Sequence, residues 1–146
     1  MRQAIVWPTN HDQQEVSTVP QITVDYAAPL AATFDRPSFG RELHRVTEET
    51  VGASVAACKT RFRPVEECVI AGGDTDVDMV HIEVAVLSGR TQDAKTELAR
   101  AVLDLARKWV APLPGRRLDL SVHIADLDRQ AYVAHQEDAR DQAASA

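Results

Sequence analysis

Three basic side chains recur at every second position of one segment of this chain. Lys59, Arg61 and Arg63 alternate with small and apolar residues. If the segment is a β-strand, side chains two residues apart point to the same side of the sheet, so the three cations share one face. Two interpretations are open: a solvated or ion-paired strand face, and a binding site for the carboxylates of an anionic ligand.

A fourth cation, Arg90, stands within the sequence Ser88-Gly89-Arg90-Thr91, between an expected strand and an expected helix. The first N–H groups of a helix and the positive end of its dipole favour an anion at such a position. An arginine there can also serve as a surface cap or an ion-pair partner. The local sequence supports both interpretations equally.

Pro20 would become a chemical group of another kind if the mature chain began with it. In the printed sequence Pro20 follows Val19, so its nitrogen is a tertiary amide that carries no proton. If Val19 is read from a GTG start codon and the initiator methionine is removed, Pro20 has a free secondary amine. An α-amino group has an ordinary pKa of about 7.7 to 8, and nearby cations disfavour its charged form. Such an amine could act as a base.

A metal site is not expected at the three alternating acids Asp74, Asp76 and Asp78. A calcium loop of this type needs glycine at its sixth position and a bidentate glutamate at its twelfth, where this chain has Met79 and Ala85. We expect a turn of solvated acids instead.

The remaining chemistry-bearing residues give no catalytic motif. His81 and His123 lie inside expected strands, where satisfied interior or interface histidines are commoner than ligands or bases. The sequence also contains no G-x-S-x-G, Walker loop, G-x-G-x-x-G or H-E-x-x-H, so hydrolase, nucleotide and zinc-protease functions have no support.

Composition narrows the class of protein further. A chain of 146 residues fits one domain, and its formal net charge of -6 argues against a nucleic-acid partner. No apolar run approaches the roughly 20 residues of a membrane span. Cys58 and Cys68 lack the spacing of a zinc site and the density of a disulfide scaffold, which predicts free thiols and a cytoplasmic location. Aromatic residues are only 5% of the chain, which favours an oligomer that buries further apolar surface.

Hydrophobic periodicity predicts the elements that position these residues. Strands are expected at 21–26, 54–70, 80–87 and 118–124, the second being a long strand or a bent pair interrupted at Pro64. A first helix begins at Pro37, has a buried stripe that includes Thr50, and is capped by Gly52. A second helix follows its N-cap Thr91 and extends to residue 109.

The order strand, helix, strand therefore occurs twice. Two such β-α-β units can merge into one four-stranded sheet with both helices on one face, an α+β fold whose other face a partner subunit could cover. We expect the folded domain at 20–136, a disordered extension at 1–19 that lies upstream of the true start if the chain begins at Pro20, and a flexible tail at 137–146.

Several short segments, in order, carry a resemblance to a known family: Pro20-Gln-Ile-Thr-Val-Asp-Tyr, Lys59-Thr-Arg-Phe, Val80-His-Ile-Glu-Val, Ser88-Gly-Arg-Thr and Leu120-Ser-Val-His-Ile-Ala-Asp-Leu-Asp. Over about residues 20–136 the chain resembles the 5-carboxymethyl-2-hydroxymuconate isomerases of the tautomerase superfamily. The resemblance implies a homotrimer without a cofactor, in which an amino-terminal proline moves a proton while isomerising an unsaturated 2-hydroxy or keto acid with two or three carboxylates. The implied substrate is 5-carboxymethyl-2-hydroxymuconate, from homoprotocatechuate degradation.

Carried over by position, the resemblance makes Pro20 the catalytic base and Arg90 a ligand of the substrate carboxylates. Lys59 falls where the family has an arginine, with Arg61 two residues on, and a lysine lacks the planar fork of arginine. Two alternatives stay open. If Met1 is the true start, the chain is a non-catalytic trimeric binding or scaffold module; if Pro20 is terminal, the pocket could instead add water to unsaturated acids or process halogenated ones.

Overall fold

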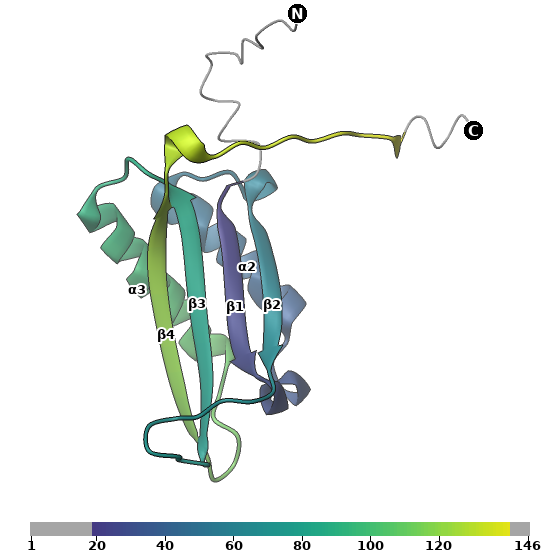
Figure 1. Ribbon diagram of the computed structural model, residues 1–146, viewed down its shortest axis with the longest axis vertical. Helices are drawn as coiled ribbons and strands as arrows, with labels where there is room; N and C mark the ends of the chain where they lie inside the picture. Colours follow the sequence, from purple (N-terminus) through teal and green to yellow (C-terminus); the bar gives the residue numbers. More distant parts are fainter. Residues whose placement is uncertain (1–18, 141–146) are drawn as a thin grey trace, which may run out of the picture.

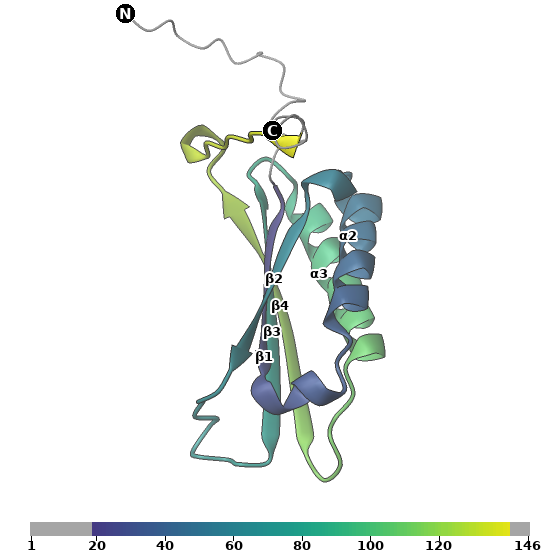
Figure 2. The same cartoon turned by 90° about the vertical axis from the view of Figure 1, so that its right-hand side faces the viewer.

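Two β-α-β units merge into one four-stranded sheet that carries both long helices on a single face (Figure 2). The computed structural model describes residues 19–140. The extension expected at 1–19 falls outside this range except for Val19, and so does the 141–146 part of the expected tail. The predicted α+β architecture is confirmed.

The first unit consists of β1 (Gln21–Ala27), α2 (Arg36–Val51) and β2 (Lys59–Val65). Alternate residues of β1 are buried, which is the pattern of a strand with one face on the core. Helix α2 is capped by Gly52, which adopts a left-handed conformation (φ 75°) and donates its N–H to the carbonyl of Glu48 at 2.9 Å. The predicted glycine cap is confirmed.

The second unit consists of β3 (Val77–Leu87), α3 (Gln92–Trp109) and β4 (Arg117–Leu127). The hydroxyl of Thr91 accepts a hydrogen bond from the N–H of Ala94 at 3.1 Å, as expected of the N-cap of α3. Three short 3-10 helices lie outside the two units' main elements: η1 (Ala28–Ala32), η2 (Val55–Ala57) and η3 (Arg129–Ala131).

The sheet has the strand order β2-β1-β3-β4 (Figure 1). Within each unit the two strands are parallel, and the units join through the antiparallel pair β1–β3. This pairing places the beginning of β1 beside the end of β3, where Gln21 pairs with Ala85. Within the described residues, β2 and β4 each have one neighbouring strand and one open edge.

The hydrophobic core lies between the sheet and the two helices. The sheet contributes fully buried side chains such as Ile22 and Val84, and the helices contribute Phe39 and Leu98. The opposite sheet face is not covered by either helix (Figure 2). Alternate residues of each strand point to this face, and in this chain they are mainly polar and charged.

The structure corrects two expectations about the first unit. The strand expected at 54–70 forms only over Lys59–Val65, and it continues through Pro64 rather than breaking there, because an edge strand tolerates a residue without an N–H. The buried polar residue of α2 is Thr47 and not Thr50; its hydroxyl donates to the carbonyl of Leu43 at 2.8 Å. The third and fourth strands are also longer than expected: β3 begins earlier, at Val77, and β4 extends from Arg117 to Leu127.

Candidate functional site

A cavity of about 310 Å³ lies at the end of the sheet where β1 begins and β3 ends. Its lining comes from four segments far apart in the sequence, which the antiparallel β1–β3 pairing and the end of α2 bring together. The lining residues are Val19, Pro20, Gly52, Ala53, Val86, Leu87, Ser88, Gly89, Arg90 and Arg129. This set contains two guanidinium groups and no carboxylate, so the cavity favours an anion.

Pro20 is buried and lies directly before the first residue of β1. Its carbonyl oxygen accepts a hydrogen bond from the main-chain N–H of Lys59 at 3.1 Å, which ties it to the start of β2. In this chain the Pro20 nitrogen is in the peptide bond to Val19, which is itself only 5% exposed. The nitrogen becomes a base only if Val19 is absent.

Arg90 lies on the same cavity as Pro20, half-buried at the junction of β3 and α3. Its two terminal nitrogens donate to the carbonyl oxygens of Leu87 at 3.4 Å and Val51 at 3.3 Å. These contacts anchor the guanidinium between the end of α2 and the start of α3. The structure therefore brings together two of the residues singled out in the sequence.

The strand cations do share one exposed face, as the alternation predicted, but they do not line this cavity. Arg63 forms a two-pronged ion pair with Asp25, with N–O distances of 2.7 and 3.1 Å. Arg61 donates to the side-chain oxygen of Gln21 at 2.9 Å. For Arg63, the ion-paired strand face is thus the interpretation that the structure supports. Lys59 is the strand cation nearest to Pro20 along the ladder.

Arg129 is a cavity residue that sequence reasoning missed. It lies in η3, just beyond β4, and its Nε donates to the carbonyl of Ser88 at 3.1 Å while its main-chain N–H donates to the Ser88 hydroxyl at 3.3 Å. The parallel pairing of β3 with β4 carries it there, because Leu87 is the partner of Leu127. No local pattern around residue 129 signals this position.

The two histidines expected to be satisfied interior or interface groups form one network on the open sheet face. Glu83 accepts from His123 Nδ1 at 2.9 Å and contacts His81 Nε2 at 3.2 Å, and His81 Nδ1 lies 2.7 Å from the Ser121 hydroxyl. Partial burial raises the pKa of the Glu83 carboxyl, but the hydrogen bonds with His123 and His81 outweigh it and leave the pKa below its ordinary value. Both histidines therefore have polar partners on this face.

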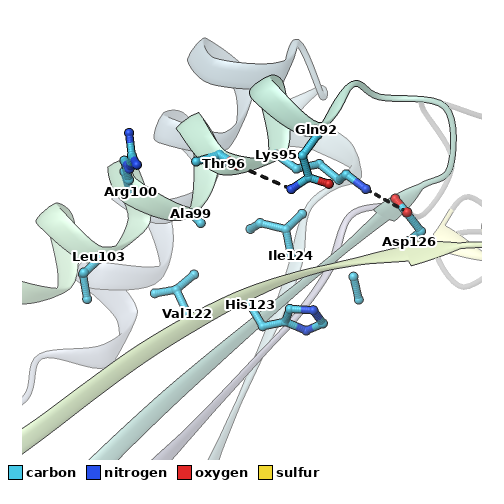
Figure 3. Close-up of a pocket in the computed structure, with 11 residues that line it drawn as sticks. Gln92, Lys95, Thr96, Ala99, Arg100, Leu103, Val122, His123, Ile124 and Asp126 are labelled. Carbon is cyan, nitrogen blue, oxygen red and sulfur yellow. Dashed lines mark hydrogen bonds and ion pairs between the residues drawn. The ribbon is translucent and has the colours of Figure 1, made fainter.

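A second and wider hollow, of about 600 Å³, lies between α3 and the outer side of β4 (Figure 3). Figure 3 shows Lys95 reaching from the helix to Asp126 of the strand, an ion pair of 2.9 Å. The floor includes the apolar side chains of Val122 and Ile124. Arg100 also lines this hollow, but its lysine is neutralised and none of the predicted site residues lines it, so it is the weaker candidate for the predicted anion chemistry.

The three aspartates of the acidic turn form ion pairs with arginines. Asp78 is 2% exposed and receives two hydrogen bonds from Arg116, while Arg117 contacts Asp74 at 3.0 Å and Asp76 at 3.2 Å. Over residues 19–140 there is no group of three side chains suited to hold a metal ion. Within the same residues, no helix is both long and apolar enough to cross a membrane.

Paired β-α-β units in one sheet, with a proline directly before β1 and an arginine lining the same cationic cavity, define a tautomerase-like protein. The model of the 5-carboxymethyl-2-hydroxymuconate isomerase family matches residues 20–139. The chain belongs to this family, a member of the tautomerase superfamily, and the predicted resemblance is confirmed. No curated protein matches the sequence.

Solved structures of the same fold are distant in sequence. A 5-carboxymethyl-2-hydroxymuconate isomerase from Deinococcus radiodurans R1 is 19% identical, with a TM-score of 0.71 over 83% of this chain and 92% of that chain. A 5-carboxymethyl-2-hydroxymuconate delta-isomerase is 17% identical, with a TM-score of 0.67 over 88% and 95% of the two chains. A fused 4-OT described as a symmetric trimer is 18% identical, with a TM-score of 0.65 over 81% and 94%.

Proposed function

We propose that this chain is a cofactor-independent isomerase whose substrate is an unsaturated 2-hydroxy or keto acid with two or three carboxylates, specifically 5-carboxymethyl-2-hydroxymuconate. The observation that carries the proposal is the shared cavity of Pro20 and Arg90. The family match supports it, because it begins at residue 20. A chain that starts there would carry its free amine inside a cavity lined by cations.

The chemistry requires one proton to leave an oxygen and one to reach a carbon. The Pro20 amine takes the proton of the 2-hydroxyl group, the electron pair moves through the conjugated system as a dienolate, and the proton returns to a conjugated carbon to give the keto form. Arg90 stabilises the negative charge of the dienolate and its neighbouring carboxylate. A base of this kind contributes about 10² to 10⁴ in rate, and one positioned donor about 3 kcal/mol.

The other carboxylates of the substrate need further cations. We propose Lys59 and Arg61 for this role, as the family resemblance implies. Lys59 is the stronger candidate of the two, since its main-chain N–H is hydrogen-bonded to Pro20. Its Nζ donates to the Ala57 carbonyl at a long 3.5 Å, whereas the Arg61 guanidinium donates to Gln21 at 2.9 Å. An ammonium group neutralises a carboxylate as a point charge and needs no fixed two-pronged geometry.

The working unit in this proposal is a homotrimer. The sheet face without helices, the open edges of β2 and β4, and the hollow beside β4 are the surfaces that subunit contacts would cover. The fused 4-OT with the same fold is described as a symmetric trimer. Two free cysteines, Cys58 and Cys68, fit a reducing compartment such as the cytoplasm.

The decisive experiment has two parts. Amino-terminal sequencing and intact mass of the protein from its natural host should give Pro20 as the first residue. In that processed protein, P20A should reduce isomerisation of 5-carboxymethyl-2-hydroxymuconate, followed by ultraviolet absorbance, at least 100-fold. A natural protein that keeps residues 1–19, or a P20A variant as fast as its parent, would remove Pro20 from the mechanism.

One observation favours a second candidate function. Val19 is buried and lines the cavity beside Pro20, so a chain that keeps Val19 blocks the nitrogen and fills part of the space. If Met1 is the natural start, the protein is a non-catalytic trimeric module that binds a carboxylate ligand. It would then bind substrate without turning it over, which a calorimetric titration next to the absorbance assay distinguishes from catalysis.

A further inference from the structure

Arg129 is the second guanidinium of the Pro20 cavity, and its position is fixed by its neighbours. The main-chain N–H of Ser88 donates to the carbonyl of Leu127 at 2.8 Å, and Arg129 returns two hydrogen bonds to Ser88. Gly89 follows with a φ of 121°, and a β-carbon added there would lie 3.9 Å from the Arg129 Nη2. The arginine side chain therefore lies directly over the turn that leads to Arg90.

The guanidinium of Arg129 has donors to spare. An arginine side chain carries five N–H donors, and the bonds of Arg129 to protein acceptors use only its Nε, on Ser88. In the described part of the chain it forms no ion pair, in contrast to Arg116 and Arg117, which both contact aspartates. The carboxylate next to it in sequence, Asp128, is engaged instead as the cap of η3, accepting from the N–H of Gln130 at 3.0 Å.

The two cavity arginines differ in depth. Arg90 is half-buried, whereas Arg129 is exposed at the opening. We propose that Arg129 is a specificity-determining residue: it binds a second carboxylate of the substrate at the mouth of the cavity while Arg90 binds the one beside Pro20. The cavity then selects acids that carry carboxylates at both ends over acids with only one. This inference rests on the proposed function for the identity of the ligand, but it concerns binding and needs no turnover.

A matched pair of stable dienes tests it. Muconate and sorbate share a six-carbon diene acid skeleton, and muconate has a second carboxylate where sorbate has a methyl group. Titration calorimetry of the protein produced from its own gene should give a Kd for muconate about tenfold lower than for sorbate, equivalent to about 1.4 kcal/mol. R129Q should reduce this ratio at least threefold by weakening muconate alone, because the exposed pair is partly screened.

Two further variants serve as controls for the position and the charge of the replaced arginine. R107Q removes the same charge from an exposed site on α3 outside the cavity and should leave the ratio unchanged. R129K keeps the charge and should retain part of the preference, and thermal unfolding checks that all variants are folded. A wild-type protein that fails to bind muconate or binds both acids equally, an R129Q ratio equal to that of wild type, or equal weakening of both acids would each overturn the assignment.

The two proposals fail in different ways. If P20A is as active as its parent but R129Q loses the preference for muconate, the proline mechanism is wrong and the carboxylate assignment stands. If P20A is inactive and R129Q binds as wild type does, the mechanism stands and Arg129 has no part in specificity.

Discussion

The main-chain N–H of Lys59 donates a hydrogen bond to the carbonyl oxygen of Pro20 at 3.1 Å, so the start of β2 holds the proline at the edge of the cavity. Arg90 lines the same cavity from the junction of β3 and α3. The proposed base and the arginine proposed to bind the substrate carboxylate thus belong to different β-α-β units. Their relative position depends on the antiparallel pairing of β1 with β3.

Replacing Arg90 should affect both the rate and its pH dependence in a chain that begins at Pro20. R90Q removes a cation that disfavours the charged form of the amine, so the pKa on the acidic side of the kcat/KM profile should rise. We expect kcat/KM at neutral pH to fall about 100-fold, since one anion-stabilising donor is lost. R107Q is the matched control. An unchanged profile in R90Q would separate Arg90 from the reacting atoms.

A half-buried histidine should make the fold sensitive to mild acid. His44 of α2 lies 2.8 Å from the Thr60 hydroxyl of β2, and burial lowers its pKa below the ordinary value of 6.5. The unfolded chain therefore takes up a proton first, and the free energy of unfolding should fall as the pH drops through about 6.5 towards the lower pKa of the folded state.

Urea unfolding at pH 7.5 and pH 5.5 measures this effect. H44Q should lose less stability over that interval than wild type, and H135Q, which changes an exposed histidine beyond the sheet, should behave as wild type. Equal losses in H44Q and wild type would show that another group titrates.

The ion pair of Asp78 with Arg116 should stabilise the start of β3 against the loop that precedes β4. Asp78 is 2% exposed and Arg116 donates to both of its oxygens, at 2.8 and 2.9 Å. D78A removes both hydrogen bonds of the Arg116 guanidinium to the buried carboxylate, and it should therefore lower the free energy of unfolding. D76N, which weakens an exposed pair with Arg117, should change little. A D78A midpoint in urea equal to wild type would contradict this.

Much of the fold follows from periodicity and capping, because these signals are local. The alternation around Ile22 and the caps Thr91 and Gly52 predicted the first strand and the ends of the helices correctly. The strand expected at 54–70 was wrong at both ends. Its length is set by its partner: β1 ends at Ala27, opposite Val65, so residues beyond that point have no strand to pair with.

The candidate site was predictable only where chemistry and position were both local. Pro20 and Arg90 stood out from their sequence context, and the structure places them on one cavity. Arg129 did not, because its place depends on the pairing of Leu87 with Leu127 across the sheet. The binding roles of Lys59 and Arg61 stay predictions, since their side chains lie outside the cavity of a single chain.

The two cysteines should differ widely in reactivity. Burial raises the pKa of the Cys58 thiol to about 11, with the nearby Glu48 charge adding to the effect, so about one thiol in a thousand is ionised at pH 8. Cys68 is exposed on the segment before β3.

Because the thiolate is the nucleophile, Ellman's reagent at pH 8 should label one thiol per native chain quickly and the second only slowly, whereas both should react at once in denaturant. C68S should remove the fast phase. A native C68S protein that still reacts quickly would mean that Cys58 is reached through local opening, and the packing of η2 against α2 would then be weaker than the buried thiol indicates.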